Sequence, residues 1–123
     1  MALLVLIVDD NEHNAKLARD VLEAAGMSIV TAATAREGLA LANRHQPDLV
    51  LMDLRLPDLD GVEAARRLRA GEATAHIPIV ALSATGAEDA DDWIRGECFS
   101  AYIAKPIDVR ELPTQVRRLC LPC

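Results

Sequence analysis

Short apolar runs alternate along the chain with segments in which apolar residues recur at helical spacing. Five runs are largely apolar: 3–8 (LLVLIV), 28–32 (SIVTA), 48–53 (DLVLMD), 77–82 (IPIVAL) and 101–105 (AYIAK). Apolar residues at consecutive positions, instead of alternating ones, are typical of strands that are buried on both faces of a parallel sheet. The pattern predicts five strands separated by helices.

The segments between these runs carry helix signals. Two sets of residues fall at i, i+3, i+4 and i+7: Ala18, Val21, Leu22 and Ala25, and then Gly61, Ala64, Ala65 and Leu68. Polar residues mark the helix boundaries. They are Asn11 or Asn14 at the start and Gly26 at the end of the first helix, Thr34 with Glu37 before the second, and Asp108 with Glu111 before the last. Because Pro113 has no N–H to donate, the last helix is expected to start late or to bend.

Five strand and helix repeats with right-handed crossovers predict a doubly wound α/β domain. A length of 123 residues suits one domain over residues 1–123, which would bury roughly two-thirds of its unfolded surface. In this architecture the site forms at the carboxyl ends of strands near a topological switch point. The residues there are Asp9, Asp10, Asp53, Ser83 and Lys105.

The three aspartates at that edge, Asp9, Asp10 and Asp53, are expected to converge. Two like charges about 4 Å apart repel by roughly 4 kcal/mol at an effective dielectric near ~20, so a cation must compensate. Oxygen ligands with open positions favour Mg²⁺, which also accepts phosphate oxygens. Lys105 offers a positive charge to a phosphoryl group, and Ser83 offers a hydroxyl. The set predicts a carboxylate acceptor in phosphoryl transfer that forms an aspartyl-phosphate.

Each of these residues also has an ordinary structural interpretation. Asp9 and Asp10 could cap a helix, Asp53 could belong to the turn that leads to Pro57, and Ser83 could cap a helix. Their common position at one edge of one predicted sheet favours the functional interpretation.

Four motifs in order resemble the receiver domains of two-component response regulators, especially stand-alone, CheY-like ones. They are VDDNEHN (8–14), MDLRLPDLDG (52–61), ALSATG (81–86) and YIAKPI (102–107). The resemblance covers nearly the whole chain. It implies a flavodoxin-like (βα)5 fold whose five-stranded parallel sheet has the order 2-1-3-4-5.

The resemblance also implies roles for individual residues. Asp53 would accept a phosphoryl group from a phosphohistidine on a sensor histidine kinase or a histidine phosphotransfer protein. Mg²⁺ would be bound directly by Asp10, by Asp53 and by the backbone carbonyl of Arg55, with Asp9 acting through water. The protein would be a phospho-accepting signalling protein. Its only catalysis would be that of its own phosphotransfer and dephosphorylation.

The same family resemblance implies a switch. Ser83, the backbone of Ala84 and Lys105 would hold the phosphoryl oxygens, while Ser83 moves toward the phosphoryl group and Tyr102 turns inward. Such a small polar event can bias a bistable packing arrangement. The surface that responds would be the fourth helix, the fifth strand and the fifth helix, which would bind a downstream target protein.

Composition excludes several other classes. A net charge of −6 disfavours a nucleic-acid partner. The longest apolar run, residues 2–8, is too short to cross a bilayer and lacks the layout of a signal peptide, so we expect a cytoplasmic protein without membrane insertion. Three cysteines give an odd count that disfavours a disulfide framework. Cys120 and Cys123 form a C-x-x-C pattern, but it closes the chain instead of opening a helix.

Rival functions fit the residues less well. An aspartate-nucleophile phosphatase needs a second acid two residues after the nucleophile, where Arg55 stands. The stretch 9–12 (DDNE), with three acidic residues, would repel the phosphate of an FMN. Dinucleotide binding would require a G-x-G-x-x-G run, and the sequence has none. A scaffold that works without phosphorylation remains the alternative. Because the chain begins with Met1 and stops soon after the last predicted helix, we expect no effector domain, and action through binding or onward transfer.

Overall fold

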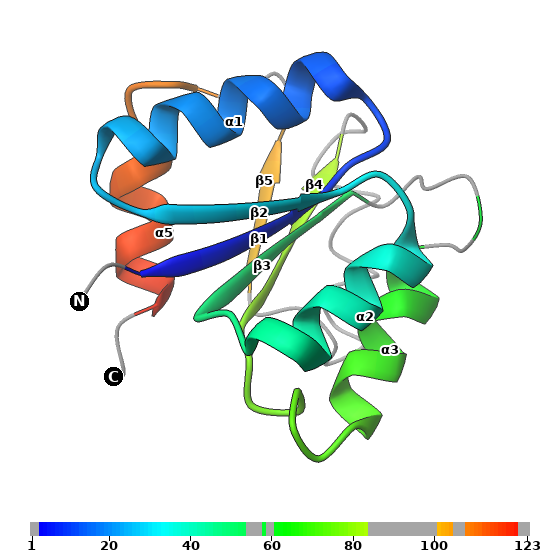
Figure 1. Cartoon of the computed structure of the whole chain (residues 1–123). Helices are drawn as coiled ribbons and strands as arrows, with labels where there is room; N and C mark the ends of the chain where they lie inside the picture. The colour runs from blue at the N-terminus through cyan, green and yellow to red at the C-terminus, as the bar shows by residue number, and fades with distance from the viewer. Residues whose placement is uncertain (1–2, 54–57, 59–60, 84–100, 105–107, 121–123) are drawn as a thin grey trace.

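The computed structural model describes residues 3–53, 58, 61–83, 101–104 and 108–120. Within them the elements, labelled as in Figure 1, are β1 Leu4–Val8, α1 Glu12–Ala24, β2 Ser28–Ala32, α2 Ala35–His45, β3 Leu49–Asp53, α3 Gly61–Ala70, β4 Ile79–Ser83, β5 Ala101–Ala104 and α5 Leu112–Cys120. The segment 84–100, where the fourth helix is predicted, lies outside the described residues.

The five strands form one parallel sheet in the order β2-β1-β3-β4-β5. Helices α1 and α5 cover one face, and α2 and α3 cover the other (Figure 1). The doubly wound α/β class and the strand order 2-1-3-4-5 are therefore confirmed.

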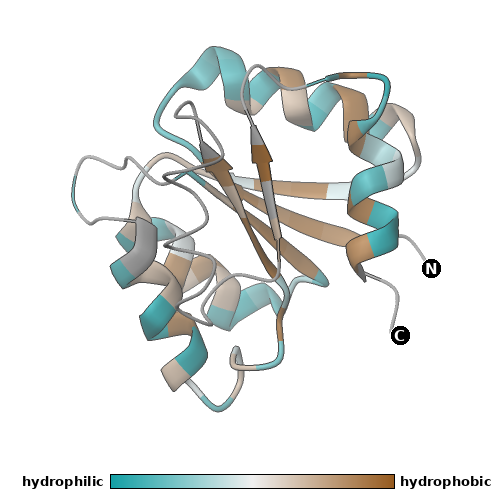
Figure 2. Cartoon of the chain, turned by 180° about the vertical axis from the view of Figure 1, so that it is seen from behind, coloured by the Kyte–Doolittle hydropathy of each residue, from teal (hydrophilic) through white to brown (hydrophobic). Residues whose placement is uncertain are grey.

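The central strands are buried on both faces, as their apolar runs predict. In β1, Val5 and Ile7 belong to the core beneath α1 and α5, whereas Leu6 and Val8 belong to the core beneath α2 and α3. All four side chains are at most 1% exposed. Burial of one such side chain stabilises the fold by about 2 kcal/mol. Figure 2 shows the hydrophobic colouring concentrated on the strands and the inner sides of the helices.

Most strand boundaries match the sequence within a residue, but β4 starts late. The apolar run predicts a start at residue 77, whereas the strand begins at Ile79. The N–H of Ile77 donates to the carbonyl of Thr74 at 3.1 Å, so this residue belongs to the preceding turn. Pro78 has no N–H for the ladder, although its carbonyl accepts the N–H of Val50 at 2.9 Å.

The first helix, α1, begins after Asn11 and ends before Gly26, two of the boundary residues that the sequence indicates. The side chain of Asn11 accepts the N–H of Asn14 at 3.1 Å, so Asn11 is the N-cap. Gly26 follows the helix with a φ of 92°, a left-handed conformation that glycine adopts without steric cost. Ala18 and Leu22 of the predicted stripe are fully buried.

The last helix starts late, as Pro113 suggests. It begins at Leu112, which places Pro113 in the first turn, where a missing N–H costs little. Asp108 and Glu111, the predicted capping box, make other hydrogen bonds than those of a capping box. The carboxylate of Asp108 accepts the N–H of Arg110 at 2.9 Å, while the N–H of Glu111 donates to the backbone carbonyl of Asp108 at 3.2 Å.

A glycine lets α2 approach the end of β1 closely. A Cβ atom added to Gly38 would lie 2.7 Å from Cγ2 of Val8, a fully buried side chain. Val8 is β-branched and stiff at χ1, so it cannot rotate away from such a contact. The spacing between α2 and β1 therefore depends on the absence of a side chain at residue 38.

Gly38→Ala is expected to lower the free energy of unfolding by about 1–2 kcal/mol, because overpacking outweighs the higher helix propensity of alanine. Urea denaturation measures the change. In a double-mutant cycle, Gly38→Ala should cost less when Val8 is already alanine. Additive effects of the two substitutions would show that the contact does not set the packing.

Candidate functional site

Three carboxylates meet at the carboxyl edge of the sheet, where β1 and β3 run side by side. In the parallel register Val8 lies opposite Met52, so Asp9, the residue after β1, and Asp53, the last residue of β3, lie beside each other at this edge. One carboxylate oxygen from each of Asp9, Asp10 and Asp53 lies within 4.8 Å of the other two. The predicted convergence of these acids is confirmed.

The three carboxylates differ in exposure. Asp9 is 3% exposed and Asp53 is 7% exposed, whereas Asp10 is exposed to solvent. Buried carboxylates are costly unless they are paired, hydrogen-bonded or bound to a cation. Asp10 therefore brings one carboxylate of the cluster into contact with solvent.

Asp9 is oriented by the backbone around it. Its carboxylate accepts the N–H of Asn11 at 2.9 Å, and its own N–H donates to the carbonyl of Ala32 at 3.0 Å. Because Asn11 is the N-cap of α1, the interpretation of the Asp9–Asp10 pair as a helix cap is wrong. Asp9 is instead held at the end of β1 with its carboxylate in the acidic cluster.

This donor set fits a hard divalent cation. Carboxylate oxygens are the ligands that Mg²⁺ and Ca²⁺ prefer, and a site with few protein ligands suits Mg²⁺, which retains several waters. Asp9, Asp10 and Asp53 are therefore the described residues that could hold a metal ion.

The other predicted site residues are described in part. β4 ends at Ser83, which lies opposite Ala104, the last residue of β5. Both strands thus end at the edge that carries the aspartates. Tyr102 is in β5, and its backbone lies opposite Ala81. Three further predicted residues lie outside the described part of the chain: Arg55, Ala84 and Lys105.

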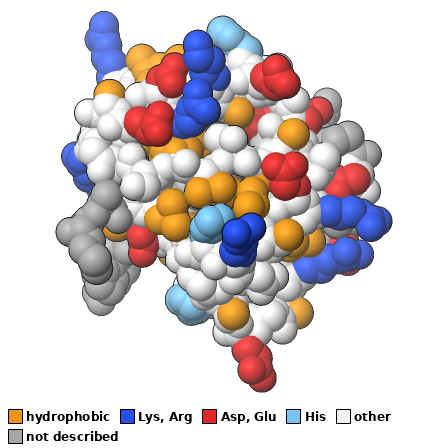
Figure 3. Space-filling view, in the orientation of Figure 1, with side chains coloured by type: hydrophobic (Ala, Val, Ile, Leu, Met, Phe, Trp, Pro, Cys, Tyr) orange, Lys and Arg blue, Asp and Glu red, His pale blue; other side chains and the backbone are white. Residues whose placement is uncertain are grey.

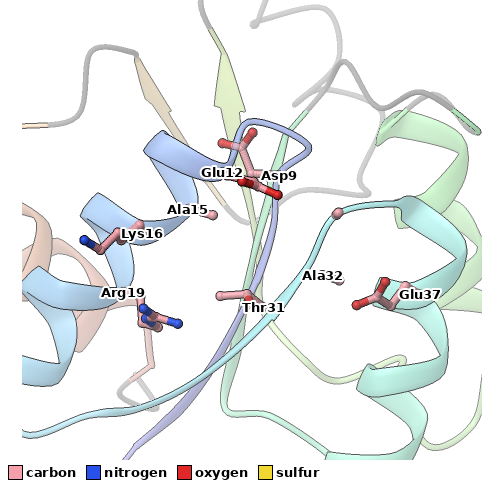
Figure 4. A pocket seen from close by; sticks show the side chains of 9 residues that line it. Asp9, Glu12, Ala15, Lys16, Arg19, Thr31, Ala32 and Glu37 are labelled. Carbon is pink, nitrogen blue, oxygen red and sulfur yellow. The ribbon is translucent and has the colours of Figure 1, made fainter.

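A hollow of about 260 Å³ adjoins the cluster between α1, β2 and the start of α2, and Asp9 forms part of its wall (Figure 4). Its charged lining residues have both signs: Asp9, Glu12 and Glu37 are acidic, and Lys16 and Arg19 are basic. A lining with charges of both signs does not indicate whether the hollow would bind an anion or a cation.

Asp58 caps the start of α2, a role that no local sequence pattern indicates. The carboxylate of Asp58 accepts the N–H groups of Ala35 and Arg36, at 2.9 and 3.0 Å, at the start of α2. These partners are more than 20 positions away in the chain. Local patterns such as capping boxes span only a few residues, so none of them could indicate this contact.

Figure 3 shows Lys and Arg side chains interspersed with Asp and Glu on this face, over the part that the structure describes. His13, His45 and His76 are all exposed. Among the described residues, no helix has both the length and the apolar character that a membrane span requires.

Comparison with known proteins identifies the family. Residues 5–117 match the family model of the response regulator receiver domain. The chain is 42% identical over 109 residues to the polar-differentiation response regulator DivK of Brucella ovis, and the match covers 89% of each chain.

Two solved structures are similar over most of their length. One is the receiver domain of the sensor histidine kinase PA1611 from Pseudomonas aeruginosa PAO1, with a magnesium ion coordinated in its active-site cleft, at a TM-score of 0.88, 31% identity and 98% coverage of both chains. The other is a CheY-like receiver domain protein from Methanospirillum hungatei, at a TM-score of 0.88, 26% identity and coverage of 98% of this chain and 94% of that one. The chain belongs to the response regulator receiver domain family, whose members accept phosphoryl groups in two-component signalling.

Asp10→Asn tests whether the three carboxylates form one cation site. Without divalent ions, removal of a charge from the cluster should raise the unfolding temperature, because it relieves repulsion. Added Mg²⁺ should stabilise the wild-type protein through preferential binding to the folded state, and should stabilise the variant much less. Thermal unfolding with and without Mg²⁺ measures both effects. Equal stabilisation of the two proteins by Mg²⁺ would contradict the assignment.

Proposed function

We propose that Asp53 is the residue that accepts the phosphoryl group. The observation that supports this assignment is the position of Asp53, the last residue of a buried strand, beside the carboxylates of Asp9 and Asp10 at an edge open to solvent through Asp10. A nucleophile on a rigid strand is held in place for in-line attack. Family membership supplies the reaction class.

In the proposed transfer, a carboxylate oxygen of Asp53 attacks the phosphorus of a phosphohistidine. A P–O bond forms, the P–N bond breaks, and the imidazole nitrogen keeps the electron pair and takes up a proton. The product is an acyl phosphate on Asp53. Attack by water on its phosphorus later releases inorganic phosphate and restores the carboxylate, so the domain promotes its own phosphotransfer and dephosphorylation.

The acidic cluster is proposed to hold Mg²⁺, through Asp10 and Asp53 directly, through the backbone carbonyl of Arg55, and through water at Asp9. When bound, the cation would offset the charge of the carboxylates and of the incoming phosphoryl oxygens. The similarity to the magnesium-containing receiver domain of PA1611 supports this proposal. The carboxylates supply hard oxygen ligands, and Asn11 keeps that of Asp9 in place.

The signal is proposed to be transmitted by a change at the carboxyl ends of β4 and β5. Ser83, the backbone of Ala84 and Lys105 would hold the phosphoryl oxygens, and Tyr102 would turn inward. The responding surface would be the predicted fourth helix with β5 and α5. The donor would be a sensor histidine kinase or a histidine phosphotransfer protein in the cytoplasm, and a downstream protein would bind the altered surface of this single domain, residues 1–123.

A scaffold that acts without phosphorylation is the alternative. Incubation with Mg²⁺ and acetyl phosphate, followed by intact mass measurement, separates the two. The wild-type protein is expected to gain one phosphoryl group. A wild-type protein that never gains this mass would favour the scaffold.

Asp53→Asn is expected to abolish this gain of mass, because an amide oxygen is too weak a nucleophile for the transfer. The variant should keep the cooperative unfolding of the wild-type protein. Asp20→Asn, which removes an equal charge from the exposed side of α1, serves as the matched control and should label normally. Labelling of Asp53→Asn at the wild-type level would refute the assignment of the acceptor.

A further inference from the structure

We propose that Asp58 is a positioning residue for the metal site, because it ties the connection after β3 to the start of α2. The inference rests on the proposed function of the acidic cluster. It assigns Asp58 no contact with the ion or with the phosphoryl group. Its effect would pass through the backbone segments that deliver the metal ligands.

The start of α2 is capped from two parts of the chain. The first N–H groups of a helix have no partner within the helix. Here the hydroxyl of Thr34 accepts the N–H of Glu37 at 3.2 Å, and the two oxygens of Asp58 accept the N–H groups of Ala35 and Arg36. A residue outside the helix thus satisfies two of its first three amides.

These contacts are stronger than the nearby ion pair. Nε of Arg36 lies 3.7 Å from an Asp58 oxygen, but the Arg36 side chain is 74% exposed, and such pairs contribute little. The Asp58 side chain is only 22% exposed and faces backbone donors at the positive end of a helix. Hydrogen bonds with one charged partner are about twice as strong as neutral ones. The helix amides therefore hold Asp58 more than the guanidinium does.

α2 contacts the residue before one proposed metal ligand, Asp9, and a residue that follows two others in the sequence. Through Gly38 it packs closely on Val8, the residue before Asp9. Through Asp58 it holds the chain five positions after Asp53 and three after Arg55. Three residues span at most about 10 Å, so an anchor at Asp58 limits where the preceding connection can lie. α2 thereby links the end of β1 to Asp58.

Coupling of this kind has a reciprocal consequence. If the contact between Asp58 and α2 favours Mg²⁺ binding by some factor, then Mg²⁺ binding must favour that contact by the same factor. A contact that only capped the helix would show neither effect. This difference separates a positioning role from a purely structural one.

The first test compares Mg²⁺ affinity among matched variants, measured from amide chemical shifts during titration. Asp58→Ala is expected to weaken Mg²⁺ binding by about tenfold, which is the lower range for loss of a group that orients metal ligands. Asp58→Asn retains one acceptor oxygen and should fall between that variant and the wild-type protein. Thr34→Ala also removes a cap from α2 but leaves the Asp58 contact, so it should destabilise the fold without change in the Mg²⁺ affinity.

The second test uses the wild-type protein alone. Mg²⁺ should slow the hydrogen exchange of the Ala35 and Arg36 amides more than that of the Glu37 amide, whose acceptor is Thr34. This measurement stays informative even if Asp58→Ala does not fold. Equal slowing of all three amides, or none, would overturn the positioning role.

The outcomes distinguish this inference from the function on which it depends. A wild-type protein that neither binds Mg²⁺ nor accepts a phosphoryl group from acetyl phosphate would refute the proposed function itself. Wild-type binding with unchanged affinity in Asp58→Ala would refute the positioning role alone. Equal weakening by Thr34→Ala would also refute it, since general loosening of α2 would then account for the effect.

Discussion

The parallel pairing of β1 with β3 is the constraint on which the site depends. Their register sets Asp9 beside Asp53 at the edge of the sheet, where the protein must keep like charges close together. Repulsion between such charges opposes folding, and the buried apolar strands on both sides of them provide the stability that allows it. The stability of the core thus offsets the repulsion within the acidic cluster.

The helices on the two faces of the sheet contact this edge in different ways. α1 begins immediately after the aspartates, and its N-cap, Asn11, donates its N–H to Asp9. α2 follows β2, yet it contacts the end of β1 through the close approach at Gly38, and its first amides donate to the carboxylate of Asp58. If a phosphoryl group bound at this edge, it would act next to elements that contact one another, β1 with α1 and α2. Such an arrangement suits a switch with two states.

Patterns local in sequence predicted much of this structure. Continuous apolar runs indicated the strands because burial on both faces leaves no polar alternation, and the acids at their ends indicated the site because parallel strands share a carboxyl edge. The late start of β4 followed from turn contacts of Ile77 that periodicity does not report. The contact of Asp58 with α2 joins residues more than 20 positions apart, and the need for Gly38 depends on the distance between two layers. Tertiary packing decides both, so no local pattern could have indicated them.

A crystal structure grown with Mn²⁺, a divalent ion of similar ligand preference whose anomalous scattering locates it, tests the central claim most directly. The account predicts an anomalous peak between the carboxylates of Asp9, Asp10 and Asp53, within bonding distance of Asp10 and Asp53. Ordered Mn²⁺ elsewhere on the protein with none at this cluster would contradict it.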